Sequence, residues 1–353
     1  MQLIHGLTQA EVVERCAEMG QKAYRAGQLW KWLYGQRVSS WEEMTNLPSA
    51  FKDQLAATFD IQPVKALTVE GEAPETRKIL VGLKDGECVE EVLIPAKGDR
   101  RTLCVSSQVG CKFACSFCAS GKGGFCRSLE AGEIVGQVLL GWREYGDRPT
   151  NIVYMGMGEP FDNYDEVLKS IRILNDGQGI NIGARHITIS TSGVIPGIER
   201  MATEGFQVEL SVSLHAPDDA LRDQLMPVNR KYPIAKLIEA CSLYVAATKR
   251  IITFEYTLIR GVNDSRAQAV ALAKLVKQLP SKVNLIPLSP VDGFQGQAPE
   301  EGTISMFVDV LAKAGLTSMV RASKGTRISA ACGQLRRRVA GDRIQKAESG
   351  IQN

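Results

Sequence analysis

The run Gly110-Cys111-Lys112-Phe113-Ala114-Cys115-Ser116-Phe117-Cys118 places three cysteines in the spacing C-x3-C-x2-C. Clustered thiolates at such short spacing are typical ligands of an iron–sulfur cluster. Because three protein ligands cannot satisfy four irons, a [4Fe-4S] cluster held by Cys111, Cys115 and Cys118 keeps one iron open. An open iron can bind a small chelating molecule. The run therefore predicts an enzyme whose chemistry is carried by a bound cofactor.

Two other interpretations of the three cysteines are a zinc site and a set of buried structural residues. A zinc site usually has a fourth Cys or His at a matching spacing. The chain contains only three histidines, His5, His186 and His215, and none of them flanks the run. The cluster interpretation is therefore favoured.

Composition is that of an ordinary globular protein, with 44% hydrophobic and 23% charged residues in a chain of 353. No apolar run approaches the roughly 18 residues of a membrane helix, and the N-terminus lacks the layout of a signal peptide. We expect a cytoplasmic protein without membrane contact, whose nine cysteines are ligands, nucleophiles or core residues rather than a disulfide framework. The net charge of +3 is too small to predict nucleic-acid binding, so any such site must be a local patch.

Periodicity divides the chain into four parts. Residues 1–60 alternate helical patterns with polar turns and predict a small helical domain. Its aromatic residues, Trp30, Trp32, Tyr34 and Trp41, are expected in the domain core rather than on a base-stacking platform. Residues 61–100 predict an extended linker, residues 101–335 a barrel, and residues 336–353 a basic tail.

From residue 101 onward, short apolar runs alternate with stretches long enough for helices. The runs are 102–107, 151–156, 186–192, 208–215, 251–259, 282–288 and 317–323. Such repeated β-α units predict a parallel sheet.

Unusual residues fall where these predicted strands end. The cysteine run and the segments 156–160, 190–193, 213–215 and 287–290 each lie at, or just beyond, the carboxyl end of one strand. Barrel-like β/α enzymes build their active sites at that face. These independent motifs therefore predict one site on one rim.

Several stretches of the chain resemble a known family. The cysteine spacing, with Phe117 before the last cysteine, resembles the radical S-adenosylmethionine (SAM) superfamily. More specific stretches are Leu103-Cys104-Val105-Ser106-Ser107-Gln108-Val109-Gly110-Cys111, Met155-Gly156-Met157-Gly158-Glu159-Pro160, Ser213-Leu214-His215-Ala216-Pro217, Asn284-Leu285-Ile286-Pro287 and Ala330-Ala331-Cys332-Gly333-Gln334-Leu335. Over nearly the whole chain the sequence closely resembles the RlmN family, radical SAM methyltransferases that act on carbon 2 of adenine in 23S rRNA and tRNA.

The resemblance implies an α/β fold, an incomplete (β/α)6 barrel with a small N-terminal helical domain that serves as an RNA-binding accessory. It also implies a [4Fe-4S] cluster with SAM on the open iron. The implied SAM contacts are Gly158, Glu159, Ser190, Ser213, Leu214, His215 and Ser289. Glu159 is suited to accept hydrogen bonds from the SAM ammonium group. Ser289 stands where the family usually has Asn, and its shorter hydroxyl can still donate and accept.

Three further residues have implied catalytic roles. Carbon 2 of adenine is not nucleophilic enough to attack the SAM methyl directly. By resemblance, Cys332 takes a methyl from one SAM, and a radical made from a second SAM removes a hydrogen from that methyl, which then adds to the ring. Cys104 then forms a transient disulfide with Cys332. Glu90 is the matching proton acceptor; its neighbour Glu91 fills the role if the register is off by one, because a strand turns the two to opposite faces.

Basic residues gather near the predicted mouth of the site. They are Arg100, Arg101, Lys112, Lys122, Arg127, Arg336, Arg337 and Arg338. Neutralisation of RNA phosphates there is expected, although such charges by themselves usually mark only a solvated face.

The sequence therefore predicts a radical SAM RNA methyltransferase that makes 2-methyladenosine, uses two SAM per turnover, acts as a monomer and receives electrons from a donor such as flavodoxin. The nearest alternative is the related family that modifies adenine carbon 8. An alternative of another class is a non-catalytic cluster-bearing redox sensor or electron carrier, which has no need of a SAM pocket or of the distant Cys332. The sequence leaves open whether rRNA, tRNA or both are substrates.

Overall fold

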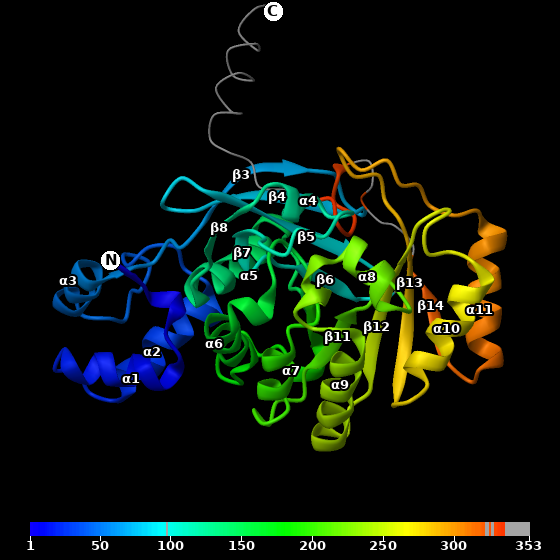
Figure 1. Cartoon of the computed structure of the whole chain (residues 1–353). Helices are drawn as coiled ribbons and strands as arrows, with labels where there is room; N and C mark the ends of the chain where they lie inside the picture. The colour runs from blue at the N-terminus through cyan, green and yellow to red at the C-terminus, as the bar shows by residue number, and fades with distance from the viewer. Residues whose placement is uncertain (97, 322–324, 326–327, 336–353) are drawn as a thin grey trace, which may run out of the picture.

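A ten-stranded sheet runs through the computed structural model, which describes residues 1–96, 98–321, 325 and 328–335 (Figure 1). The strand order is β14-β13-β12-β11-β10-β9-β6-β5-β4-β3. The strands are β3 (Lys65–Glu70), β4 (Arg77–Gly82), β5 (Cys88–Pro95), β6 (Arg101–Cys104), β9 (Asn151–Tyr154), β10 (Ile187–Thr191), β11 (Glu209–Ser213), β12 (Ile252–Leu258), β13 (Ser281–Pro287) and β14 (Thr317–Val320).

Strands β6 and β9 to β14 are parallel to one another and form the barrel part of the sheet. Helices connect successive strands: α5 (Ala131–Tyr145), α6 (Tyr164–Asn175), α7 (Ile195–Met201), α8 (Asp219–Leu225), α9 (Ile234–Thr248), α10 (Arg266–Val276) and α11 (Glu301–Lys313). Each of the seven predicted apolar runs overlaps one of these strands. The predicted incomplete (β/α) barrel is thus confirmed, with β14 added beyond the sixth strand.

The sequence explains why these segments form strands and helices. Every residue of β12 is buried, as expected for a parallel strand covered on both faces. Helix α5 begins with a capping box between Glu130 and Glu133, and ends at Gly146, which adopts a left-handed φ of 75°. The capping residues therefore determine where helix α5 begins and ends, whereas burial of apolar side chains determines the position of strand β12.

Strands β3, β4 and β5 extend the sheet in antiparallel fashion beside β6. In this ladder Lys78 pairs with Val92, and Val92 pairs in turn with Cys104. Directly opposed residues share a face, so these three side chains lie in one row. The extension therefore brings a predicted catalytic cysteine into line with residues of the preceding hairpin.

The N-terminal part is helical, as predicted. It contains η1 (Ile4–Gly6), α1 (Gln9–Glu18), α2 (Tyr24–Trp30), η2 (Lys31–Gln36) and α3 (Ser49–Thr58), closed by the short strands β1 (Gln2–Leu3) and β2 (Phe59–Asp60). Trp30, Tyr34 and Trp41 are buried in its core, whereas Trp32 is partly exposed. Trp30 also donates a hydrogen bond from Nε1 to Asp176 Oδ1 at 3.1 Å, which ties this part to the barrel.

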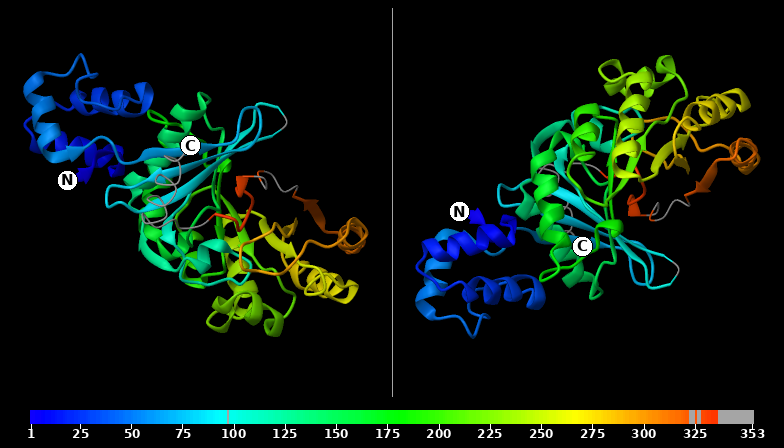
Figure 2. Two further views of the ribbon diagram at one scale, coloured as in Figure 1. Left: turned by 90° about the horizontal axis from the view of Figure 1, so that it is seen from above. Right: turned by 90° about the horizontal axis from the view of Figure 1, so that it is seen from below.

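The segment that carries Cys332 returns to the middle of the molecule. In both views of Figure 2, residues 328–335, drawn in red, lie between the cyan extension and the yellow and orange end of the barrel. The backbone N–H of Ala119 donates to Gly333 O at 2.7 Å, and Ser120 Oγ donates to Leu335 O at 2.6 Å. These contacts hold the segment against the cysteine run. Within the part of the chain that the structure describes, no helix combines the length and apolar character needed to cross a membrane.

Candidate active site at the carboxyl ends of the barrel strands

A cavity of about 150 Å³ opens at the carboxyl ends of the parallel strands. Ten of the predicted site residues line it: Cys111, Cys115, Cys118, Gly158, Glu159, Ser190, Ser213, His215, Ser289 and Cys332. They come from the carboxyl ends of five different strands, or the loops just after them, and from the C-terminal segment. The motifs that the sequence predicts to share one rim therefore line one cavity in the structure.

A second cavity of about 340 Å³ adjoins the first and is lined by Cys104, Cys332 and Arg100, among others. Cys118, Ser289 and Cys332 border both cavities. Cys104 is buried, Cys332 is exposed, and both are free thiols. The two cysteines that the sequence pairs thus face one shared space, and Cys332 stands at the boundary between the two cavities.

The cysteine run is held in a tight loop between β7 (Gln108–Gly110) and α4 (Ala119–Lys122). Gly110 has a φ of 77°, and a Cβ there would lie 1.7 Å from Gly124 O, so only glycine fits. Burial raises the pKa of Cys111 to about 12 and raises that of Cys115 well above its ordinary value. All three cysteines are half-buried and border the first cavity.

Glu159 is fixed by the backbone on both sides of the cavity. Its carboxylate accepts hydrogen bonds from Phe161 N at 3.0 Å and from Ser192 N at 2.6 Å. Burial, the largest influence, raises its pKa, while these hydrogen bonds oppose the shift. Gly158 has a φ of 98°, and a Cβ there would lie 2.5 Å from Cβ of Gln108. A carboxylate has about four lone-pair sites, so Glu159 retains acceptor capacity for a ligand.

His215 is a neutral wall residue. It adopts a left-handed φ of 55°, its Nδ1 accepts a hydrogen bond from Thr257 N at 2.9 Å, and its ring meets Phe117 edge-on at 4.9 Å. Burial lowers its pKa to about 3. Because Nδ1 is an acceptor, the ring proton sits on Nε2. Leu214, by contrast, is fully buried and is the one predicted SAM contact that does not line the cavity.

Glu90 is not among the residues that line the two cavities. Its carboxylate is buried, and Lys78 Nζ lies 3.2 Å from its Oε1. Glu90 shares a face with Val92 and Cys104, since alternate strand residues point the same way. Glu91 faces helix α5 instead, where a Cβ on Gly141 would lie 2.9 Å from its Oε1. The two neighbours therefore have different surroundings, and only Glu90 is on the side of the cysteines.

Known proteins resemble this chain over nearly its full length. The Radical SAM superfamily model matches residues 105–273, and the model for the ribosomal RNA large subunit methyltransferase N-terminal domain matches residues 3–61. A relative from Moorella thermoacetica, named probable dual-specificity RNA methyltransferase RlmN, is 47% identical and covers 94% of this chain and 96% of its own. The chain belongs to the RlmN family of radical SAM methyltransferases.

Two further comparisons agree. A Geobacillus thermodenitrificans relative with the same name is 46% identical over 94% of this chain and 92% of its own. The crystal structure of a radical SAM methyltransferase from Sphaerobacter thermophilus has a TM-score of 0.92 and 47% identity, and the match covers 95% of this chain and 99% of that one. The predicted family and fold are thereby confirmed.

Membership in the RlmN family implies a [4Fe-4S] cluster and SAM, and the donor set fits both. No group of three or more His, Cys, Asp or Glu among the described residues is arranged to hold a single metal ion. Cys111, Cys115 and Cys118 instead border a volume, as expected of thiolates that hold a multi-iron cluster. Glu159 and the serine hydroxyls supply acceptors and donors for a polar ligand beside it.

Arg222 was not anticipated from the sequence. Its guanidinium is fully buried and donates to the carbonyls of Ser192 at 2.7 Å, Ser213 at 3.0 Å and Leu214 at 3.1 Å. Burial lowers its pKa to about 10. Within the charged helix α8 this residue reads as an ordinary surface arginine. In the RlmN fold it instead fixes the ends of two neighbouring barrel strands.

Glu255 and Arg321 were also missed. Glu255 lines the first cavity and accepts a hydrogen bond from Ser190 Oγ at 3.0 Å. Arg321 lines the second cavity, with Nη1 3.7 Å from Glu255 Oε1 and 3.5 Å from Met155 Sδ. Negative charge on Cys332, the largest influence, raises the pKa of Arg321. In the sequence, the one sign of a functional residue here was a glutamate within the apolar run 251–259.

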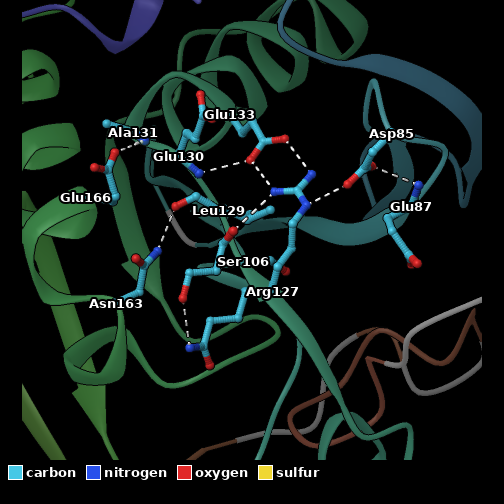
Figure 3. Close-up of polar contacts among 12 residues, drawn as sticks. Asp85, Glu87, Ser106, Arg127, Leu129, Glu130, Ala131, Glu133, Asn163 and Glu166 are labelled. Carbon is cyan, nitrogen blue, oxygen red and sulfur yellow. Dashed lines mark hydrogen bonds and ion pairs between the residues drawn. The ribbon is translucent and has the colours of Figure 1, made fainter.

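Arg127 is occupied within the protein. Figure 3 shows its guanidinium between Glu133 and Asp85. Nη1 and Nη2 each lie 2.8 Å from a Glu133 oxygen, and Nε lies 2.6 Å from Asp85 Oδ2. The expected phosphate contact at this position is therefore an internal clamp that joins strand β8 (Phe125–Ser128) to α5 and to the β4–β5 turn.

Three of the other predicted basic residues make contacts within the protein. Lys112 is paired with Asp162, and Lys122 Nζ donates to Asp292 O at 2.9 Å. Arg101 donates from Nε to Arg148 O at 3.0 Å. Arg100 lines the second cavity, whereas Arg336, Arg337 and Arg338 lie outside the described residues. Of the predicted basic residues that the structure describes, Arg100 is thus the best placed to meet a substrate at the cavity.

Proposed function

We propose that this chain converts adenosine to 2-methyladenosine in 23S rRNA and tRNA. The observation that carries the proposal is that Cys104 and Cys332 line one cavity, directly beside the cavity bordered by the cysteine run. A non-catalytic electron carrier has no use for a thiol pair in that position. The names of the relatives, which are dual-specificity RNA methyltransferases, support RNA as the substrate class.

The proposal assigns the first cavity to the cofactors. Cys111, Cys115 and Cys118 hold the cluster, and the SAM contacts are Gly158, Glu159, Ser190, Ser213, His215 and Ser289. When bound, the cluster and SAM supply a deoxyadenosyl radical, and SAM also supplies a methyl group. Leu214 contributes to the SAM site through its carbonyl oxygen, which accepts a hydrogen bond from Arg222 Nε at 3.1 Å.

Cys332 carries the transferred carbon. As a thiolate it accepts a methyl group, becomes a methyl thioether and then loses one hydrogen atom from that methyl. The resulting carbon radical forms a bond to carbon 2 of the adenine, and the adduct gives up its unpaired electron to the electron carrier, so enzyme and RNA are covalently joined. Two SAM are therefore consumed per turnover, one as the methyl donor and one as the radical source. The position of Cys332 at the boundary of the two cavities supports both steps.

Cys104 and Glu90 release the product. Glu90 accepts the proton from carbon 2. The Cys104 thiolate attacks the sulfur of Cys332, a disulfide forms, and the electron pair of the sulfur–carbon bond passes to the methylene carbon, which is protonated to a methyl group. The disulfide is then reduced before the next turnover. The position of the buried Cys104 at a cavity that Cys332 also lines supports this role.

The four parts of the chain have separate tasks in this proposal. They are an RNA-binding accessory at 1–60, an extension at 61–100, the radical SAM barrel at 101–335 and a basic tail at 336–353. RNA phosphates neutralised by Arg100 and by the tail arginines make binding salt-dependent. The enzyme acts as a monomer and receives electrons from a donor such as flavodoxin.

Nucleoside mass spectrometry tests this function directly. Reconstituted protein is supplied with SAM, a reductant and either a 23S rRNA fragment or tRNA, and the digested RNA is separated. We expect 2-methyladenosine from both RNAs and none from free adenosine. Formation of 8-methyladenosine would assign the chain to the carbon-8 chemistry, and cleavage of SAM without RNA methylation would overturn the proposal.

A further inference from the structure

Lys78, on strand β4, is one of the most deeply buried charged residues, with 1% of its side chain exposed. Its Nζ lies 3.2 Å from Glu90 Oε1 and 3.5 Å from Glu70 Oε2. Glu90 is equally buried, whereas 34% of the Glu70 side chain is exposed. Lysine is almost never buried unless it is paired. Lys78 thus links an inner carboxylate to one that reaches solvent.

The lysine lies in the row of side chains that leads to Cys104. Lys78 is opposite Val92, and Val92 is opposite Cys104 on the next strand. Glu90 lies two residues before Val92 and so points to the same face. In a regular antiparallel ladder such diagonal neighbours are about 7 Å apart, which puts Glu90 within reach of both Lys78 and the Cys104 region.

The segment that carries Cys332 covers this same hairpin. A Cβ on Gly325 would lie 2.8 Å from Thr76 Cγ2, and a Cβ on Gly71 would lie 3.1 Å from Ile328 Cδ1. Thr76 is only two residues from Lys78 in the chain. The segment that carries Cys332 therefore packs against the start of the strand that carries Lys78.

We propose that Lys78 is a positioning residue that holds the Glu90 carboxylate on the strand face that it shares with Cys104, and that it passes the accepted proton to Glu70. The inference rests on the proposed function, in which Glu90 accepts the carbon-2 proton. Burial alone does not favour such a pair, because an apolar replacement of a buried ion pair is often as stable. A role in the reaction accounts for its retention beside the two cysteines.

The proton balance is simple. The Glu90 carboxylate takes the ring proton and becomes a carboxylic acid. The Lys78 ammonium gives one proton to the Glu70 carboxylate and then takes the proton from Glu90. Glu70 releases its proton to water. Nothing is oxidised or reduced, and the net result is one proton moved from the buried carboxyl group to solvent.

The test measures release of RNA from Cys332 with Cys104 intact. Holoenzyme carrying Lys78→Met, Glu90→Gln or both is reacted with RNA, and the covalent complex is followed on denaturing gels with and without nuclease. We expect both single variants to accumulate the complex and to release RNA at least about tenfold more slowly than wild type, in line with the usual effect of a general base. The double variant should be no slower than Glu90→Gln alone, because Lys78 acts through Glu90.

Lys84→Met is the matched control, since Lys84 lies on the same hairpin and pairs with Asp60 at the surface; it should behave as wild type. Glu70→Gln should release the first RNA normally and slow later turnovers. Normal later turnovers in Glu70→Gln would overturn the relay, and this variant stays informative if Lys78→Met does not fold. Wild-type release by Lys78→Met, with the complex still accumulating in Glu90→Gln, would overturn the Lys78 role alone. Normal release by Glu90→Gln would overturn both the base assignment and this inference.

Discussion

The side-chain oxygen of Gln108 accepts a hydrogen bond from the backbone N–H of Glu159 at 2.9 Å. Gln108 is fully buried on β7, directly before the cysteine run, and its Nε2 also donates to Asp162 Oδ2 at 2.9 Å. One side chain therefore joins the loop assigned to the cluster to the loop assigned to SAM. The contact therefore fixes one loop relative to the other.

Replacing Gln108 by alanine should weaken SAM binding about tenfold, because it leaves the buried N–H of Glu159 unpaired at a cost of about 1–3 kcal/mol. Isothermal titration of reconstituted protein with SAM measures the effect. Gln137→Ala is the matched control, since Gln137 is equally buried and makes two hydrogen bonds, at 2.9 and 3.0 Å, to the backbone of Ser106. Equal loss of SAM affinity in both variants would contradict the account.

Gly158→Ala should abolish SAM cleavage and lower the free energy of unfolding by about 2–4 kcal/mol. The new Cβ would lie 2.5 Å from Cβ of Gln108, at a φ of 98° that only glycine adopts freely. Gly302→Ala is the control: a Cβ there meets nothing within 4 Å, and the residue lies in α11. That variant should be as stable as wild type or up to about 1 kcal/mol more stable. Urea denaturation separates the two, and an active Gly158→Ala enzyme would be evidence against the assigned site.

Arg127→Gln should lower the free energy of unfolding by about 1–2 kcal/mol, with little effect on RNA affinity, because its charge is already paired with Glu133 and Asp85. Arg100→Gln should have little effect on the free energy of unfolding. It should weaken RNA binding and reduce the salt dependence of that binding by about one phosphate contact. Filter binding at several salt concentrations, beside thermal unfolding, distinguishes the two variants. Weaker RNA binding by Arg127→Gln alone would restore its place at the phosphate surface.

Release of RNA from Cys332 should accelerate with pH. Burial, reinforced by the nearby Cys332, raises the pKa of Cys104 to about 12. Below that pH the thiol is mostly protonated, and only the thiolate attacks. The resolving rate should therefore rise about tenfold per pH unit between roughly pH 7 and 9. Rapid-quench measurement of the covalent complex checks this, and a rate independent of pH would show that another group performs the attack.

The sequence predicted the parts of the site that depend on local pattern. The cysteine spacing, the alternating β-α runs and the motifs at the strand ends are all short-range features, and the structure brings their residues to one rim. Arg222 could not be foreseen, because its hydrogen-bond partner Ser192 lies 30 residues away in the chain. Its role exists only once two strand ends are adjacent.

Arg127 illustrates the opposite error. A cation near the cysteine run suggested a phosphate contact, yet Asp85, 42 residues earlier, pairs with it in the folded chain. Charge in a sequence shows that a partner is required, not which partner is present. Glu90 and Glu91 are a third case: alternation along the strand predicted opposite faces for them, and only the packing of Glu91 against Gly141 of α5 shows which face is which.

The most direct test of the central claim, that Cys332 carries the transferred carbon and Cys104 releases it, compares Cys104→Ala with Cys332→Ala. Protein purified after expression is run on denaturing gels with and without nuclease, and its peptides are analysed by mass spectrometry. The account predicts RNA attached to the peptide containing Cys332 in Cys104→Ala, and neither methyl-cysteine nor attached RNA in Cys332→Ala. Free and fully active Cys104→Ala protein, or RNA attached in both variants, would contradict it.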